Sequence, residues 1–323
     1  MNPYFKDYKW SINNELKQMA NDTTLSIYTR ADAYLALGEY NFNHKFIFEN
    51  GFSDQEAVVR TAAVEAIAKI CKDPEFDKNV GLGRVKVKKE LSTFLSEAIN
   101  KGDASMRYHA ANVLSQPLGF KALFENSSFL HVAKRDLKLP KETETLYAIQ
   151  KAIDFFDDKE TQNELPAYNH PIDWNLLNGV NENSIASIKT KKGSINLILF
   201  PLAAPATVVN FIKLAEDGYY NGKTFHRVVP NFVVQGGCPI GDGFGSLDYS
   251  IRSELPMMNF SEQGYVGMAS AGKDTEGVQF FITNSPTPHL DGKYTIFAKV
   301  KDGMDIVHKI EVGDTIESIK IIK

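Results

Sequence analysis

Residues 224–237 concentrate side chains that could do chemistry in this 323-residue chain. They include His226 and Arg227, and they end with Gln235 and two glycines. Neither His226 nor the following Cys238 has an oriented partner that would make a nucleophile–base pair, so the sequence does not favour a hydrolase. The distinctive feature is the guanidinium of Arg227, which is permanently charged, has several N–H donors and lies in a segment rich in apolar residues.

Other motifs in this region do not predict cofactor or metal chemistry. The glycines at 236–237 and 241–245 lack the Lys-Ser/Thr of a phosphate-binding loop and its strand-to-helix context, so we expect them in turns. Residues 242–254 lack the spacing of a calcium-binding EF-hand. No His-x-x-x-His or Cys-x-x-Cys pair occurs to hold a metal ion. We therefore expect neither a cofactor nor a metal.

Residues 224–237 and three later segments together resemble the cyclophilin family of peptidyl-prolyl cis-trans isomerases. The later segments are Gly267-Met-Ala-Ser-Ala-Gly272, Gly277-Val-Gln-Phe-Phe-Ile282 and Leu290-Asp-Gly-Lys-Tyr294. The resemblance covers residues 184–323. It implies an enzyme that rotates X-Pro peptide bonds in flexible or unfolded proteins and assists their folding.

The resemblance also implies a role for each site residue. Amide resonance sets a barrier of roughly 18–20 kcal/mol to rotation, and a donor aimed at the prolyl nitrogen stabilises the twisted state. Arg227 is the expected donor and Gln235 is expected to orient it, while Phe232, Val233, Phe281, Leu290 and Tyr294 form the proline pocket. The expected catalytic residues are Arg227, Phe232, Gln235 and Phe281, and the expected substrate-binding residues are Val233, Ala269, Ser270, Ala271, Gln279, His289, Leu290 and Tyr294.

Two parts of this site depart from patterns common in the family. Ser270 stands where asparagine is more usual, and contacts made through its backbone should survive. His289 and Tyr294 stand where many eukaryotic members carry tryptophan and histidine. Tyr294 keeps an aromatic wall, whereas His289 lacks the indole donor important for cyclosporin recognition, so weaker cyclosporin binding is expected. His226 is expected to be structural rather than a general base.

Short β-rich runs carry these residues. We predict strands over 185–190, 194–200, 225–229, 232–235, 265–268, 279–283 and 296–300, with a hairpin turn at 191–193. An amphipathic helix is predicted over 205–216, closed by Gly218. Many short strands, abundant glycine and few helices indicate a mainly-β, closed antiparallel barrel of cyclophilin type with flanking helices.

The first half of the chain has a helical period instead. Apolar residues recur every three or four positions over 57–70 and 87–99. Ser53 or Asp54 is the expected N-cap of the first helix, and Gly102-Asp103 marks the start of a later one.

A short pattern recurs in this half. Arg30, Arg60 and Arg107 are each followed three residues later by alanine and then by an apolar pair. This spacing resembles HEAT-like repeats and predicts an all-α helical-repeat domain that binds a protein partner. A plain helical bundle with these alanines in its core is the alternative.

The period changes at the breaker-rich stretch Leu165–Pro171, which divides the chain into a HEAT-like domain (1–165), a linker (166–183) and a cyclophilin-like domain (184–323). The net charge of −4 argues against a nucleic-acid binder. No apolar run reaches the roughly 18 residues that span a membrane. We expect Cys71 and Cys238 to be buried singly, one in each half.

The sequence therefore predicts an isomerase acting on proline-containing peptides and unfolded protein clients. The rival hypothesis is a non-catalytic scaffold whose barrel only binds a proline-containing partner. The start of the chain has no apolar signal segment, so we expect a cytoplasmic protein. A secreted or lipid-anchored form whose signal has been trimmed is the alternative.

Overall fold

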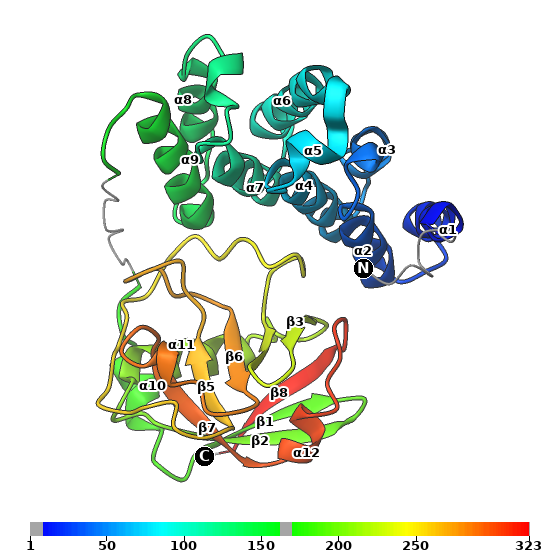
Figure 1. Ribbon diagram of the computed structural model, residues 1–323. Coiled ribbons are helices and arrows are strands. Elements are labelled where there is room, and N and C mark those ends of the chain that lie inside the picture. The colour runs from blue at the N-terminus through cyan, green and yellow to red at the C-terminus, as the bar shows by residue number, and fades with distance from the viewer. Residues whose placement is uncertain (1–8, 162–169, 323) are drawn as a thin grey trace. The chain divides into compact units, whose positions relative to one another are not determined.

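The computed structural model describes residues 9–161 and 170–322, and Figure 1 shows their helices and strands. These residues form two compact units, one made of 9–137 with 144–161 and the other of 138–143 with 170–322. The predicted boundary at residue 165 and most of the breaker-rich stretch lie outside the described residues. The domain limits given above therefore remain predictions.

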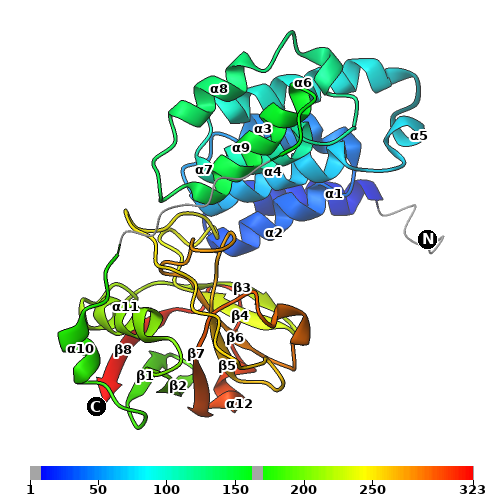
Figure 2. The ribbon, with the colours of Figure 1, turned by 90° about the vertical axis from the view of Figure 1, so that its left-hand side faces the viewer.

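The first unit is helical, as predicted. Its helices are α1 (Lys9–Asn21), α2 (Ile27–Leu37), α3 (His44–Gly51), α4 (Ala57–Cys71), α5 (Phe76–Val80), α6 (Arg84–Lys101), α7 (Ala104–Leu114), α8 (Ser128–Arg135) and α9 (Thr143–Phe156). They pack in pairs, α1 with α2, α3 with α4 and α6 with α7, and the second members α2, α4 and α7 form a row (Figure 1). Figure 2 shows α3 and α6 on one side of this row. The extra helix α5 lies between the second and third pairs and accounts for the longer second spacing of the arginine pattern.

Small residues let these helices approach closely, as the repeated alanines predicted. A Cβ atom added to Gly38, just after α2, would lie 2.9 Å from the Cα of Ala66 on α4. One added to Gly51, at the end of α3, would lie 2.4 Å from the Cβ of Ala63. Carbon atoms in ordinary contact are about 3.5–4.0 Å apart. Both glycines are therefore required by the packing of α2 and α3 against α4.

Two of the three repeated arginines, Arg30 and Arg60, join successive helix pairs. Arg30 on α2 forms a largely buried ion pair with Asp54, in the loop before α4. Arg60 on α4 binds the Asp103 carboxylate through Nε at 2.9 Å and Nη2 at 2.8 Å. Asp103 also caps α7 by accepting a hydrogen bond from the backbone N–H of Met106. Corresponding arginines of the repeated pattern thus make the same contact twice, which is consistent with a helical repeat.

The predicted N-cap of α4 is wrong. Glu56 occupies that position and makes no side-chain capping bond. The Asp54 carboxylate accepts a hydrogen bond from the backbone N–H of Glu56 at 2.9 Å and pairs with Arg30. Ser53 is exposed. A buried guanidinium is a stronger partner for a carboxylate than a helix terminus, and the sequence spacing does not reveal it.

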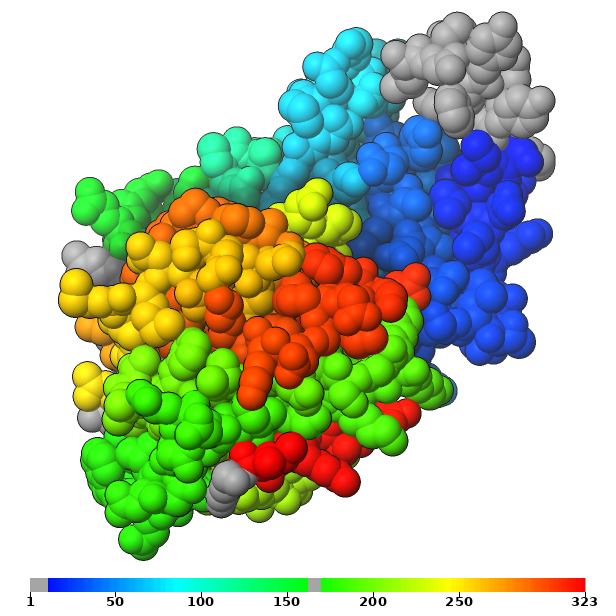
Figure 3. Space-filling view, turned by 90° about the horizontal axis from the view of Figure 1, so that it is seen from below, coloured from blue at the N-terminus to red at the C-terminus, as the bar shows by residue number. Residues whose placement is uncertain are grey.

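The second unit is an eight-stranded antiparallel sheet. Its strands are β1 (Ile185–Thr190), β2 (Gly193–Leu199), β3 (Phe225–Val229), β4 (Val233–Gly236), β5 (Tyr265–Met268), β6 (Phe280–Thr283), β7 (Ile296–Asp302) and β8 (Ile316–Ile322). Their order is β3-β4-β6-β5-β7-β2-β1-β8. In Figure 3 the red β8 segment lies at the surface beside the green segment of β1 and β2.

The two edge strands of this sheet meet through the segments that precede them. The backbone N–H of Phe225 donates to the carbonyl of Asp314, and that of Ile316 donates to the carbonyl of Lys223, both at 2.8 Å. A single bridge, Thr224 to Thr315, lies between these bonds. The sheet therefore curls into a barrel that this short junction closes only in part, a looser closure than the predicted closed barrel.

Three helices accompany the barrel. α11 (Pro205–Glu216) has the predicted bounds, packs on β7 and β8, and ends before Gly218, whose φ is 72°. Residues Val208, Phe211 and Ile212 of α11 fill the main core. The seven predicted strands are present within two residues at each end, whereas β8, α10 (Trp174–Asn178) and α12 (Met304–Val307) were not predicted. α10 packs against α11 although it lies in the predicted linker.

Candidate active site

The β3–β4 hairpin presents Arg227 beside Phe232. Asn231 has a φ of 57° in the turn after Pro230, a left-handed conformation that asparagine tolerates. A bulge within β3 then brings Arg227 opposite Gln235. Arg227 is exposed, and its Cζ lies 5.6 Å from the centroid of the Phe232 ring. This contact holds a cation over an aromatic face at the end of the hairpin.

An apolar cluster lies next to this hairpin. Phe281 meets the Tyr294 ring edge-on with centroids 5.6 Å apart, and its centroid is 5.7 Å from that of Phe260. The five residues predicted to form the proline pocket all belong to this cluster or pack against it. Its buried members are Val233, Phe260, Phe281, Leu290 and Ile296, and its partly buried neighbours include Phe232, Met258, Ala269 and Tyr294.

Gly267 on β5 sets the position of the Phe281 ring. The two residues are paired across the β5–β6 ladder. A Cβ atom at Gly267 would lie 2.4 Å from Cζ of Phe281, well inside ordinary contact distance. Because Gly267 has no side chain, the Phe281 ring can lie directly against β5.

Two glutamines connect the hairpin to the neighbouring strand. Gln235 Nε2 donates to Gln279 Oε1 at 3.0 Å. Gln279 Nε2 in turn donates to the carbonyl of Gly243 at 3.0 Å. We expected Gln235 to orient Arg227, but no hydrogen bond joins them among the described residues. The Arg227 guanidinium instead lies over the Phe232 ring.

The predicted peptide-binding residues 269–271 follow β5 directly. The backbone N–H of Ala269 donates to the carbonyl of Gln279 at 2.9 Å, which ties this segment to β6. The N–H of Ala271 donates to Thr275 Oγ1 at 2.8 Å, and that hydroxyl donates to the carbonyl of Gly272 at 2.7 Å. These bonds fix a compact turn, called here the 269–275 edge, beside Gln279.

Electrostatics leave Arg227 as the charged group of the hairpin. Burial and the adjacent Arg227 charge lower the pKa of His226 to about 4, so its imidazole is neutral at pH 7. Burial, with the Asp242 carboxylate, raises the pKa of the Cys238 thiol to about 11. A neutral histidine and a protonated thiol suit the structural roles predicted for both residues.

The sequence analysis missed two buried residues of this region. Phe260 is fully buried against Phe281, but it lies in an irregular segment with no hydrophobic period to reveal it. Glu276 is also fully buried, next to the 269–275 edge. From the sequence alone, Glu276 would be expected at the surface, as glutamates usually are. Its burial depends on tertiary contacts.

Comparison with known proteins identifies the second unit. The family described as "Cyclophilin type peptidyl-prolyl cis-trans isomerase/CLD" matches residues 185–323. A peptidyl-prolyl cis-trans isomerase of Helicobacter pylori is 47% identical over 137 residues, which cover 42% of this chain and 85% of that protein. The chain belongs to the cyclophilin-type peptidyl-prolyl isomerase family. It is an isomerase of X-Pro peptide bonds, as the sequence predicted.

Other cyclophilins are similar over the same region. Peptidyl-prolyl cis-trans isomerase B of Bacillus subtilis is 48% identical over 128 residues, covering 39% of this chain and 90% of that protein. A solved cyclophilin-type isomerase from Cryptosporidium parvum is 32% identical and covers 43% of this chain and 98% of that one, with a TM-score of 0.42. The family match begins at residue 185, so the helical unit lies outside it.

His289 lies in the short 3₁₀ turn Pro288–Leu290. Its ring stacks on Phe232 with centroids 5.3 Å apart and planes 25° apart. It is exposed on its other side. Phe232 is therefore covered by Arg227 and His289 together, which holds its ring in place at the pocket rim.

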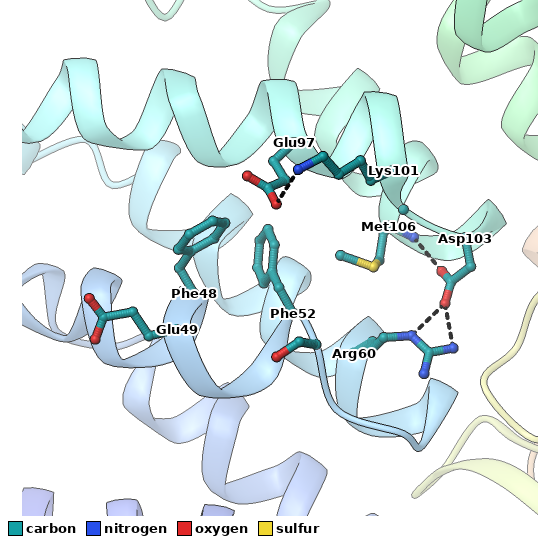
Figure 4. A pocket seen from close by; sticks show the side chains of 10 residues that line it. Phe48, Glu49, Phe52, Arg60, Glu97, Lys101, Asp103 and Met106 are labelled. Carbon is teal, nitrogen blue, oxygen red and sulfur yellow. Dashed lines mark hydrogen bonds and ion pairs between the residues drawn. The ribbon is translucent and has the colours of Figure 1, made fainter.

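The helical unit has a pocket of its own, of about 520 Å³. Figure 4 shows Phe48 and Phe52 on one side and the Met106 side chain pointing toward them. The Glu97–Lys101 and Arg60–Asp103 ion pairs lie at its border. Glu49 lies at one end, exposed and without an ion pair among the described residues. The pocket combines an apolar floor with a rim that carries an unpaired negative charge.

Three further features concern the described residues only. None of their helices is long and apolar enough to cross a bilayer. No three His, Cys, Asp or Glu side chains within ranges 9–161 and 170–322 are grouped to hold a metal ion. Cys71 and Cys238 are both free and buried, one in each unit, as predicted.

Proposed function

We propose that the barrel unit isomerises X-Pro bonds by directing the Arg227 guanidinium at the prolyl nitrogen. The observation that carries this proposal is an exposed guanidinium, without an ion pair among the described residues, placed over Phe232 beside the apolar cluster that contains Val233 and Phe281. The pocket formed by Phe232, Val233, Phe281, Leu290 and Tyr294 holds the pyrrolidine ring. The chain on the other side of the bond is then free to rotate.

The guanidinium lowers the barrier because its interaction is strongest in the twisted state. In the planar amide the nitrogen lone pair is delocalised and accepts hydrogen bonds poorly. As the bond rotates, the lone pair localises and accepts a bond from Arg227, which stabilises the transition state more than either ground state. The backbone of the 269–275 edge and Gln279 bind the residues before proline. No covalent intermediate or cofactor is required.

The test is a pair of substitutions at Arg227 with a matched control. Arg227→Ala should lower kcat/KM for a short X-Pro peptide by roughly 10²–10³, the usual effect of removing one preorganised donor. Arg227→Lys should rescue poorly because it lacks the planar fork of donors. Arg84→Ala, at an exposed arginine of the helical unit, should leave the rate unchanged. A folded Arg227→Ala protein with full activity would exclude this mechanism.

The rival scaffold function uses the same pocket without catalysis. A scaffold would need the residues that bind the proline ring, but it would not need the exposed guanidinium of Arg227. The unpaired Arg227 therefore favours the enzyme. Binding of a peptide without acceleration of its isomerisation would favour the scaffold.

We further propose that the helical unit binds extended segments of unfolded protein clients through its 520 Å³ pocket. A bulky apolar side chain would enter between Phe52 and Met106, and an adjacent lysine or arginine of the client would meet Glu49 at the rim. Holding a client near the barrel raises the effective concentration of its prolines at Arg227.

Substitutions in the pocket test this second proposal. Phe52→Ala should raise KM for a proline-limited unfolded client about tenfold, as loss of an apolar anchor does. Glu49→Lys should raise it about two- to fivefold. Neither should change kcat/KM for a short peptide. The controls are Leu82→Ala and Glu15→Lys, at exposed positions of the same unit outside the pocket. Equal KM values for all four variants would refute this site.

We also propose a reducing, cytoplasmic location. Two free cysteines, each buried singly, fit a compartment where disulfides do not form. Cell fractionation tests this proposal, and recovery of the protein outside the cytoplasm would refute it.

A further inference from the structure

A buried carboxyl group lies directly behind the proposed peptide-binding edge. Glu276 is fully buried, and both of its carboxyl oxygens lie within hydrogen-bond distance of Thr295 Oγ1, at 2.8 and 3.0 Å. Its backbone carbonyl accepts the N–H of Ile251 at 2.9 Å. Its neighbour Thr275 is the residue whose hydroxyl holds the N–H of Ala271. Glu276 therefore belongs to the same short segment that shapes the 269–275 edge.

The contacts of Glu276 connect three segments. Thr295 is fully buried, directly follows the pocket residue Tyr294, and accepts through its carbonyl the N–H of Met268 at 3.0 Å. Its hydroxyl accepts the N–H of Glu254 at 2.8 Å, so the hydroxyl proton is left to donate to Glu276. Segments 251–254, 268–276 and 294–295 are thus joined at one carboxyl group.

A second hydroxyl completes this network. Ser253 exchanges two hydrogen bonds with Asp274, because its N–H donates to Oδ1 and its Oγ accepts the Asp274 N–H, both at 2.9 Å. The Ser253 hydroxyl also lies near enough to the Glu276 carboxyl to lower its pKa. Two hydroxyl groups therefore surround a neutral carboxyl, which can accept one hydrogen bond and donate another.

The surroundings disfavour a charge on Glu276. The ionisable residues on the segments packed around it are Arg252, Glu254, Lys273, Asp274 and Tyr294. Of these, Glu254 acts on it electrostatically, and that carboxylate is held in place by the Ala206 and Thr207 N–H groups at the start of α11. Burial raises the pKa of Glu276 to about 8, with a small addition from the Glu254 charge, although hydrogen bonds from Thr295 and Ser253 oppose this rise. No basic group within residues 9–161 and 170–322 acts electrostatically on Glu276 to offset the charge of its ionised form.

We propose that Glu276 is a positioning residue of the isomerase: its neutral carboxyl holds the 269–275 edge against segments 251–254 and 294–295, and its ionisation releases this edge. Substrate binding is then favourable while Glu276 is protonated and weakens when it is charged. Arg227 and the proline pocket are not altered, so the effect falls on KM rather than on kcat. This proposal rests on the proposed role of the edge in peptide binding.

The sign of the pH effect follows from the raised pKa. Below about pH 8 the folded protein keeps the Glu276 proton, and above it the proton is lost. With a pKa of about 8, about nine tenths of the Glu276 carboxyl groups are protonated at pH 7 and about one tenth at pH 9. We therefore expect kcat/KM to fall about tenfold between these two pH values, through a rise in KM. The substrate is a short X-Pro peptide blocked at both ends, which has no titrating group in this range.

Two variants test the proposal in the full-length protein. Glu276→Gln keeps the shape and the neutral state of the side chain, so kcat/KM should stay flat from pH 7 to pH 9. Glu262→Gln, at an exposed glutamate paired with Lys299, is the matched control and should keep the wild-type fall. A Glu276→Gln protein that loses activity at high pH as wild type does would overturn the proposal.

A direct titration covers the case in which Glu276→Gln does not fold. In wild-type protein labelled with ¹³C and ¹⁵N, the Glu276 carboxyl shift should have a midpoint near pH 8, and the amide signals of residues 269–271 should move with the same midpoint. A carboxyl midpoint near 4.5, or amide signals that do not follow it, would overturn the proposal. Absence of isomerase activity at pH 7 would instead contradict the proposed function, because this titration does not depend on catalysis.

Discussion

Replacing Gly267 by alanine should push the Phe281 ring into the proline pocket. The new methyl carbon would lie 2.4 Å from Phe281 Cζ, so the ring must move by roughly 1 Å to reach an ordinary contact of about 3.5 Å. Overpacking of this kind costs about 1–3 kcal/mol of stability. The melting temperature should fall by a few degrees for each kcal/mol lost, given the size of this unit. We expect the ring to move away from β5, toward the space assigned to proline.

The catalytic effect should exceed the effect on stability. A displacement of about 1 Å in a substrate-positioning group can cost up to about 10²-fold in rate, so we expect kcat/KM to fall about 10- to 100-fold. A protease-coupled assay on a short X-Pro peptide measures this change, and circular dichroism measures the melting temperature. Gly179→Ala is the matched control, since its nearest neighbour would be 3.4 Å away and its φ is −87°. If Gly267→Ala matched this control in both assays, Phe281 would not line the pocket.

Three other predictions address the inhibitor, the helical unit and the division into units. His289→Trp should tighten cyclosporin binding by on the order of 1–3 kcal/mol in calorimetry, and an unchanged affinity would place residue 289 outside the contact. Arg30→Ala should destabilise the helical unit by about 3–5 kcal/mol because it leaves Asp54 buried without its partner, with short-peptide turnover unchanged. A helical unit that melts as in wild type would contradict this. A fragment of residues 170–323, which keeps α10 on α11, should fold and isomerise short peptides at nearly the full rate, whereas an insoluble or inactive fragment would show that the units share a core.

The sequence predicted those parts of the fold that local pattern determines. Short β-rich runs located β1 to β7, and the run from Pro205 to Glu216 gave α11 its observed bounds. The alanines after Arg30 and Arg60 indicated close helix contacts, which Gly38 and Gly51 complete from other positions in the chain. β8 does not alternate regularly, because Ile316 and Ile319 are buried three positions apart and the β1–β8 register shifts at Lys189–Thr190, so no simple period marked it as a strand.

Features that depend on competition between distant groups were not predictable. Asp54 was a reasonable cap for α4, but the guanidinium of Arg30 binds it from another helix. Gln235 was expected to orient Arg227, whereas its side-chain amide donates a hydrogen bond to Gln279 beside the neighbouring strand. Glu276 belongs to a residue type that is normally exposed, and its burial depends on hydroxyl groups of two other segments.

Exchange NMR on one blocked X-Pro peptide tests the central claim most directly. With a catalytic amount of the full-length protein, exchange cross-peaks between the cis and trans forms should appear, although uncatalysed exchange takes tens to hundreds of seconds. With Arg227→Ala the peptide signals should still shift on binding, because the pocket is intact, while the exchange rate falls by roughly 10²–10³. Binding without acceleration by the wild-type protein, or full acceleration by Arg227→Ala, would contradict the account.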